Sequence, residues 1–228
     1  MTTPTPSTTT LGTSQAEILV RVYFLRSGKV APVARTVATP AVASAALQQL
    51  AAGPTRQERA DGFTSAVGTV SSNLVIENGI ATLDLPNVSH AGLAQIVYTL
   101  TQFPAVHGVR ATRTIGDSQP MTGADFEDVT PSILVESPLP GETVTSPLRV
   151  YGTANTFEAT FDIEIVNSSG VRAAWRFDTA SSGSGTRGTF NTTISFPHAG
   201  GPITLLLYEP SAENGKPIHV VRIPLNER

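Results

Sequence analysis

The pattern of apolar residues near the start of the chain predicts a β-hairpin. Residues 17–25 (EILVRVYFL) and 30–37 (VAPVARTV) are rich in β-branched and aromatic residues, the types that strands favour. Ser27-Gly28 separates the two runs and is typical of a tight turn. The two segments are therefore expected to pair as antiparallel strands.

A helix is predicted next, because the apolar spacing lengthens to three and four residues. Val42, Ala46, Leu47 and Leu50 recur at helical spacing. Gly53-Pro54 follows, and glycine and proline at these positions end a helix. The helix is expected to stop at Gly53.

The strongest local signal is Asn78-Gly79 inside residues 74–85 (LVIENGIATLDL), because this dipeptide between strand-like runs favours a two-residue type I′ turn. The turn sets the register and puts Ile76 opposite Ala81 and Leu74 opposite Leu83. These four apolar side chains are expected to share one face of the hairpin.

A second helix is predicted to cover that face. Ser89 is a suitable N-cap, and apolar residues follow at helical spacing before Pro104, namely Leu93, Ile96, Val97 and Leu100. Residues 106–115 then read as a last strand. The order ββαββαβ predicts an α+β domain over residues 16–116.

Beyond residue 131, apolar residues recur at every second position, as they do in half-buried β-strands. Residues 157–165 alternate, with Phe157, Ala159, Phe161, Ile163 and Ile165 expected toward a core and Glu158, Thr160, Asp162 and Glu164 toward solvent. Seven such strands within residues 132–228 predict an all-β immunoglobulin-like sandwich. Trp175 lies on one of these strands and is expected in the core.

Prolines mark the start of this second domain. Pro138, Pro140 and Pro147 cannot donate to a sheet, so we place them in the crossing between an edge strand and the next strand. Gly141 allows a tight turn there. The run YGTANTF, from Tyr151 to Phe157, follows directly.

Two segments carry no periodicity. Residues 1–15 are almost all Thr, Pro and Ser and predict a disordered tether. A tether suggests an export signal or anchor ahead of it, the alternative being an ordinary frayed terminus. Residues 117–131 collect Gly, Pro and carboxylates and are interpreted as a solvated linker.

Composition excludes several classes of function. The net charge is −3 and no Lys/Arg cluster exceeds a pair, so nucleic acid is not an expected partner. The chain has no cysteine, which removes thiolate metal sites, catalytic thiols and disulfides. No run reaches the roughly 18 apolar residues of a membrane helix, and the first residues lack the pattern of a signal peptide.

The sequence gives only weak signals for a catalytic, metal or cofactor site. The four histidines, His90, His107, His198 and His219, have no metal-binding spacing. The run GSGTRG (183–188) matches a dinucleotide pattern, but a strand follows it instead of the required helix. Asp117, Asp125, Glu127 and Asp128 could bind calcium, although a solvated linker is favoured. Glu158, Asp162 and Glu164 are interpreted as a solubilising face in preference to a glycosidase pair.

Both halves resemble known families. The segments VRVYFLRSGKVAPVARTV, LQQLAAGPT and ENGIATLDL resemble the GerMN domain of spore germination proteins. The proline-bracketed run, YGTANTFEATF and the closing VRIPL resemble the immunoglobulin-like domain of bacterial spore germination. The motif positions are Gly53, Pro54, Asn78, Gly79, Pro138, Pro140, Gly141, Pro147, Gly152 and Phe157.

The resemblance implies an exported, often lipid-anchored protein of the bacterial cell envelope, of actinobacterial type, that has no catalytic residue, cofactor or metal. It implies action through contacts with other envelope proteins or by self-assembly, with the membrane reached only through an anchor. The alternative is a binder of peptidoglycan or another glycan, for which Tyr151 and Tyr208 are the candidate contacts. A hydrolase is the third class considered.

Overall fold

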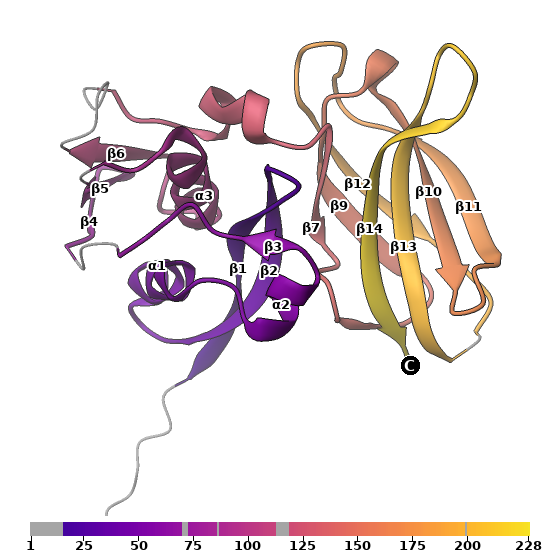
Figure 1. Cartoon of the computed structure of the whole chain (residues 1–228), viewed down its shortest axis with the longest axis horizontal. Helices are drawn as coiled ribbons and strands as arrows, with labels where there is room; N and C mark the ends of the chain where they lie inside the picture. Colours follow the sequence, from indigo (N-terminus) through magenta and orange to yellow (C-terminus); the bar gives the residue numbers. More distant parts are fainter. Residues whose placement is uncertain (1–15, 70–72, 86, 113–118, 199) are drawn as a thin grey trace, which may run out of the picture.

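The computed structural model describes residues 16–69, 73–85, 87–112, 119–198 and 200–228. Two units lie side by side, an α+β unit from the first half of the chain and a β-sandwich from the second (Figure 1). This confirms the predicted fold class. The expected tether at residues 1–15, the end of the last predicted strand of the first unit and Asp117 lie outside the described residues.

The first hairpin is confirmed. Strands β1 (Glu17–Arg26) and β2 (Lys29–Ala38) pair antiparallel, with Arg26 opposite Lys29. Ser27 and Gly28 have φ of 52° and 76°, as a type I′ turn requires. A short strand β3 (Phe63–Thr64), which the sequence pattern did not predict, adds to the other edge of β1 near its end.

Helix α1 (Val42–Ala52) is also confirmed, and it ends at Gly53, whose φ is 79°. One turn of helix that was not predicted follows, α2 (Arg56–Ala60). It has no buried side chain and depends on a capping box, in which Thr55 accepts from the Glu58 backbone N–H and Glu58 accepts from that of Thr55.

A second sheet contains β4 (Val75–Glu77), β5 (Ile80–Asp84) and β6 (Gly108–Thr112), in that order. Asn78 and Gly79 have φ of 51° and 79°, and Ile76 lies opposite Ala81 as expected. Ala81 and Leu83 are buried, but Ile76 is 39% exposed. Its strand is the edge of the sheet, and the core does not extend under it.

Helix α3 (His90–Thr101) connects β5 to the parallel strand β6. Ser89 caps it by accepting from the Gly92 N–H, as predicted. Eight of the twelve residues of α3 are buried, with the polar Gln95 and Thr99 among them. Thr99 accepts from the Tyr23 N–H, and Gln95 donates to the Tyr23 carbonyl, so the helix satisfies the backbone of β1 on the edge that faces away from β2.

The segment expected to be a solvated linker packs against the first unit instead. Met121 and Val109 exchange two backbone hydrogen bonds, of 2.7 and 2.9 Å. The 3-10 helix η1 (Gly123–Val129) then buries Phe126 in the first core with 2% exposure. Phe126 is a single large apolar residue in a polar segment, so it gives no periodic hydrophobic signal. The sequence pattern therefore did not predict this packing.

The second unit has two facing sheets. One contains β12 (Gly188–Ile194), β9 (Leu148–Ala154) and β7 (Ile133–Ser137). The other contains β11 (Arg172–Thr179), β10 (Thr160–Asn167), β13 (Gly201–Pro210), β14 (Pro217–Glu227) and the short β8 (Thr143–Val144). Apolar side chains from both sheets fill the space between them.

Two predictions about aromatic residues in this unit are wrong. Phe161, Ile163 and Ile165 are fully buried as expected, but Phe157 is 58% exposed. It lies in the 3-10 turn η2 (Phe157–Ala159), where Glu158 and Ala159 have φ of 53° and 61°, so the strand begins only after it. Trp175 is 52% exposed and outside the core.

The proline-rich crossing follows the expected course. Strand β7 is the edge of its sheet, and Pro138, Pro140 and Pro147 lie between strands. Gly141 has φ of 83° and donates its N–H to the Pro224 carbonyl at 2.8 Å. On β9, a Cβ at Gly152 would lie 2.0 Å from the Leu134 carbonyl oxygen, so only glycine fits.

Candidate functional site

The two units share a polar interface. The Tyr23 hydroxyl donates to Glu136 at 2.9 Å, and Arg21 donates to the Tyr151 hydroxyl at 3.0 Å. Burial raises the pKa of Tyr23 well above its ordinary value, and the charge of Glu136 raises it further. Tyr23 therefore remains a protonated donor.

Segment η1 adds a second set of contacts. Glu127 accepts from Arg187 through both carboxylate oxygens, at 2.8 and 2.9 Å. The hydrogen bond from Arg187 lowers the pKa of Glu127 below its ordinary value. Arg187 also donates to the Pro131 carbonyl at 2.8 Å. This bidentate pair fastens the end of the first unit to the loop before β12.

Strand β7 belongs to both hydrophobic cores. Ile133 and Val135 point into the sandwich core, while Leu134 points into the core of the first unit. All three are at least 97% buried. Because alternate residues of a strand face opposite sides, a single strand joins the two cores.

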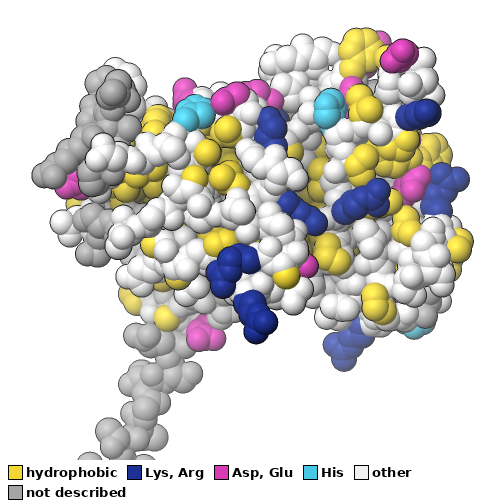
Figure 2. Space-filling model, viewed as in Figure 1, with side chains coloured by type: hydrophobic (Ala, Val, Ile, Leu, Met, Phe, Trp, Pro, Cys, Tyr) yellow, Lys and Arg dark blue, Asp and Glu magenta, His cyan; other side chains and the backbone are white. Residues whose placement is uncertain are grey.

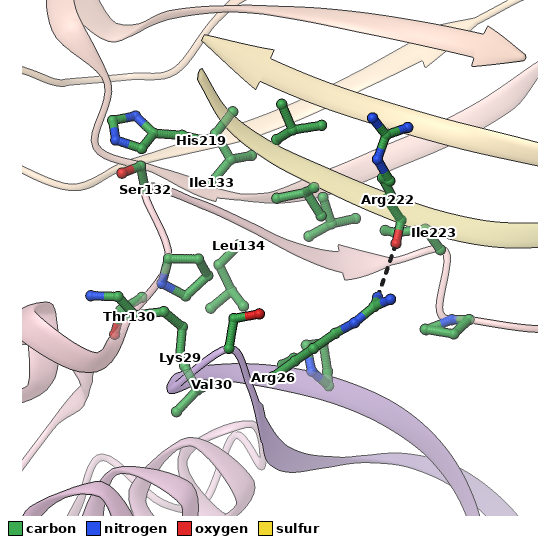
Figure 3. Close-up of a pocket in the computed structure, with 18 of the residues that line it drawn as sticks. Arg26, Lys29, Val30, Thr130, Ser132, Ile133, Leu134, His219, Arg222 and Ile223 are labelled. Carbon is green, nitrogen blue, oxygen red and sulfur yellow. Dashed lines mark hydrogen bonds between the residues drawn. The ribbon is translucent and has the colours of Figure 1, made fainter. Parts of the chain in front are cut away.

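A groove of about 510 Å³ lies at this junction (Figure 3). The β1–β2 turn forms one wall and β14 the other, with β7 between them. Val30, Ile133, Leu134 and Ile223 lie beneath it and are at most 5% exposed, and Val220, 39% exposed, gives it accessible apolar surface. The volume is in the range of ordinary ligand sites, roughly 300 to 1,000 Å³.

Basic side chains surround the groove, as Figure 2 shows for this face of the junction. Arg26 lies over the Phe63 ring, 5.4 Å from its centroid, and donates to the Arg222 carbonyl at 3.3 Å. Lys29 donates to the Asp128 carbonyl, and His219 contacts Glu209 through Nδ1 at 2.8 Å. No Asp or Glu is among the described residues that line the groove.

A second surface is the outer face of the larger sheet. Trp175 and Phe177 on β11 are 52% and 53% exposed. Register puts Trp175 opposite Glu164 and Phe177 opposite Asp162, so the rings and the carboxylates share one face. Figure 1 shows β11 at the side of the sandwich that lies away from the first unit.

The face expected to be a plain solubilising surface is therefore partly covered. Asp162 is only 9% exposed. Glu164 accepts from the Tyr208 hydroxyl at 2.8 Å and pairs with Arg172 at 3.1 Å. Burial, and then the hydrogen bond to Glu164, raise the pKa of Tyr208 above its ordinary value.

The two candidate glycan contacts are not brought together. Tyr208 is 9% exposed and lies on β13 of the larger sheet. Tyr151 lies on β9 of the smaller sheet, where its hydroxyl accepts from Arg21 and Arg149 stacks over its ring at 5.3 Å. Tyr208 is buried, and Tyr151 is partly exposed with its hydroxyl and ring in contact with arginine side chains. The exposed aromatics on β11 were missed because Trp175 was assigned to the core.

The carboxylates considered for calcium also diverge. Asp125 accepts from the Thr122 N–H at 2.7 Å, Glu127 pairs with Arg187, and Asp128 contacts His90 at 2.9 Å. In the part of the chain that the structure describes, no three His, Asp or Glu residues are placed to hold a metal ion. The loop GSGTRG precedes strand β12, as the sequence indicated.

The fold is that of a two-domain protein, in which an α+β unit is followed by an immunoglobulin-like sandwich. The family model for sporulation and spore germination matches residues 21–112, and the model for the immunoglobulin-like domain of bacterial spore germination matches residues 132–216. The chain therefore carries these two domains in this order. A comparison with curated proteins found no match.

Proposed function

We propose that the chain is a non-enzymatic binding protein of the bacterial cell envelope, exported and anchored, that acts by contact with other envelope proteins in an assembly of the sporulation or germination type. The descriptions of its two domain families support this proposal. No helix among the described residues is long and apolar enough to cross a membrane.

The observation that carries the proposal is the exposed aromatic pair on β11. Trp175 and Phe177 are two residues apart on one face, and Val171, 60% exposed, precedes them. Large apolar side chains exposed together mark interaction surfaces, and aromatic residues supply much of the binding energy at protein interfaces. Strand β11 is also an edge strand, so it offers an open backbone edge beside the rings.

A pull-down of envelope proteins on the immobilised chain tests the proposal. The unchanged chain and the control Gln57→Ala, at an exposed site on α2, are expected to retain the same proteins. The double variant Trp175→Ala, Phe177→Ala is expected to lose them, because the apolar contact area is removed. Equal retention by all three forms would contradict the proposal.

Glycan binding is the second candidate, and one observation favours it. Trp175 lies exposed on a sheet face directly opposite Glu164, and an aromatic ring beside a hydrogen-bonding carboxylate is an arrangement that can hold a sugar. Retention of the chain on purified peptidoglycan separates the two functions. Retention that disappears with Trp175→Ala and survives Tyr151→Ala would favour glycan binding through this face.

A further inference from the structure

The groove between the units has basic side chains and no Asp or Glu among the described residues of its lining. The neighbouring acids, Glu127 and Asp128 beside Lys29 and Glu209 beside His219, lie outside that lining. Arg26 and Lys29 are cross-strand neighbours at the β1–β2 turn, and both side chains lie along the groove (Figure 3). Among the described residues, their hydrogen bonds go to the backbone carbonyls of Arg222 and Asp128. A guanidinium has five N–H donors, so Arg26 retains donors for an anion.

The opposite wall supplies an imidazole and an open strand edge. His219 directs Nδ1 to Glu209, which leaves Nε2 as the ring nitrogen available for another contact. Strand β14 pairs with β13, but on its other side it pairs with β8 only at Asn226 and Glu227. Its earlier residues, from Pro217 to the groove, therefore have no strand on that side among the described residues.

The third wall is strand β7, which has β9 on one side and is the last strand of its sheet on the other. Its residues 133–135 are at most 3% exposed, so their backbone is not accessible to a peptide, and the open edge of the groove is that of β14. Unpaired strand edges present backbone N–H and C=O groups that can accept another extended chain. Val220, which is 39% exposed, and the partly exposed Ala31 and Val221 supply apolar surface beside this edge.

We propose that this groove binds an extended acidic peptide segment of a partner protein. The open edge of β14 suits the peptide backbone, the apolar lining suits alternate side chains, and Arg26 and Lys29 suit carboxylates. The groove lies at the junction of the units, on the other side of the larger sheet from β11, so the inference is independent of the proposed aromatic contact surface.

Fluorescence anisotropy with a defined peptide tests the site on the whole chain. The probe is a fluorescein-labelled octapeptide of alternating Glu and Val, and the matched probe has Lys in place of Glu. The acidic probe is expected to bind at least about tenfold more tightly than the basic one, because the charges are complementary. Equal affinity for the two probes would overturn the proposal.

Variants locate the binding. Arg26→Ala and Lys29→Glu are each expected to weaken binding of the acidic probe by about tenfold or more, through loss of charge-assisted hydrogen bonds. Arg172→Ala, which removes an exposed positive charge on β11 at the opposite edge of the sheet, is the matched control and is expected to leave affinity unchanged. Thermal unfolding of each variant verifies that it is folded.

Two results would count against an acidic peptide in this groove. One is an affinity that Lys29→Glu does not change in a folded variant. The other is complete displacement of the probe by millimolar inorganic phosphate, since that would show a site for a small anion instead of a peptide. Backbone amide shifts in β14 on peptide addition are the positive outcome expected by NMR.

Discussion

Trp175 and Phe161 lie on neighbouring strands and have opposite environments. Alternation shows that a strand has two faces, but it does not show which face is inside. The pairing with β10 shows which face of β11 is inside, because Ala174 lies opposite the buried Ile165, whereas Trp175 lies opposite Glu164. The β11 residues on the inner side are small or polar, so the largest apolar side chain faces outward, and sequence analysis assigned it wrongly to the core.

Gly152 is required at its position because the backbone of Leu134 on β7 passes very close to it. Ala at this position would bring Cβ against the Leu134 carbonyl oxygen and the Phe190 ring. Gly152→Ala is expected to lower the free energy of unfolding by at least about 2 kcal/mol, because packed backbone cannot move aside easily. Chemical denaturation measures this. Gly68→Ala, where a Cβ would meet nothing within 4 Å, is the control, and equal stability of the two variants would refute the explanation.

At the scale of elements, the features that were predicted correctly depend on neighbouring residues in the sequence. Both type I′ hairpins follow from their turn dipeptides, and α1 and α3 follow from apolar spacing and end signals. Helix α2, strand β3 and the packing of η1 depend on a cap or on contacts far along the chain. The groove was not predicted for the same reason, since its walls come from residues about 26–32, 130–140 and 219–223.

The attachment of η1 to the second unit should depend on pH. The pKa of Glu127 is lowered in the folded protein, chiefly by its hydrogen bond from Arg187, relative to an ordinary value of 4.5. A lowered pKa contributes stability that is present above 4.5 and is lost as pH falls through the folded value. Glu127→Gln is therefore expected to be less stable than the unchanged chain at pH 7 and equally stable well below pH 4.5.

Denaturation curves at the two pH values measure this difference. Glu213→Gln, at an exposed position that has no ion pair with any described residue, is the matched control and is expected to match the unchanged chain at both pH values. A stability loss for Glu127→Gln that is the same at pH 7 and at pH 3 would mean that the charge of Glu127 does not contribute.

At the scale of the whole molecule, the two units are joined through a shared strand and a network of polar contacts. Leu134 extends the first core into β7, and Tyr23, Glu136 and Arg21 connect the units beside it. Such a junction fixes the groove between the units and leaves β11 exposed at the far side. The molecule thus presents two separate surfaces, one aromatic and one basic.

The central claim is that the chain acts by contact through the aromatic face of β11. Photocrosslinking in the living bacterium tests it most directly, with a photoreactive amino acid at Thr179, an exposed position on β11, and at Gln57 as control. Discrete adducts with envelope proteins are predicted from Thr179, absent from Gln57 and abolished by Trp175→Ala. Adducts that persist unchanged in Trp175→Ala, or that form equally from Gln57, would contradict the account.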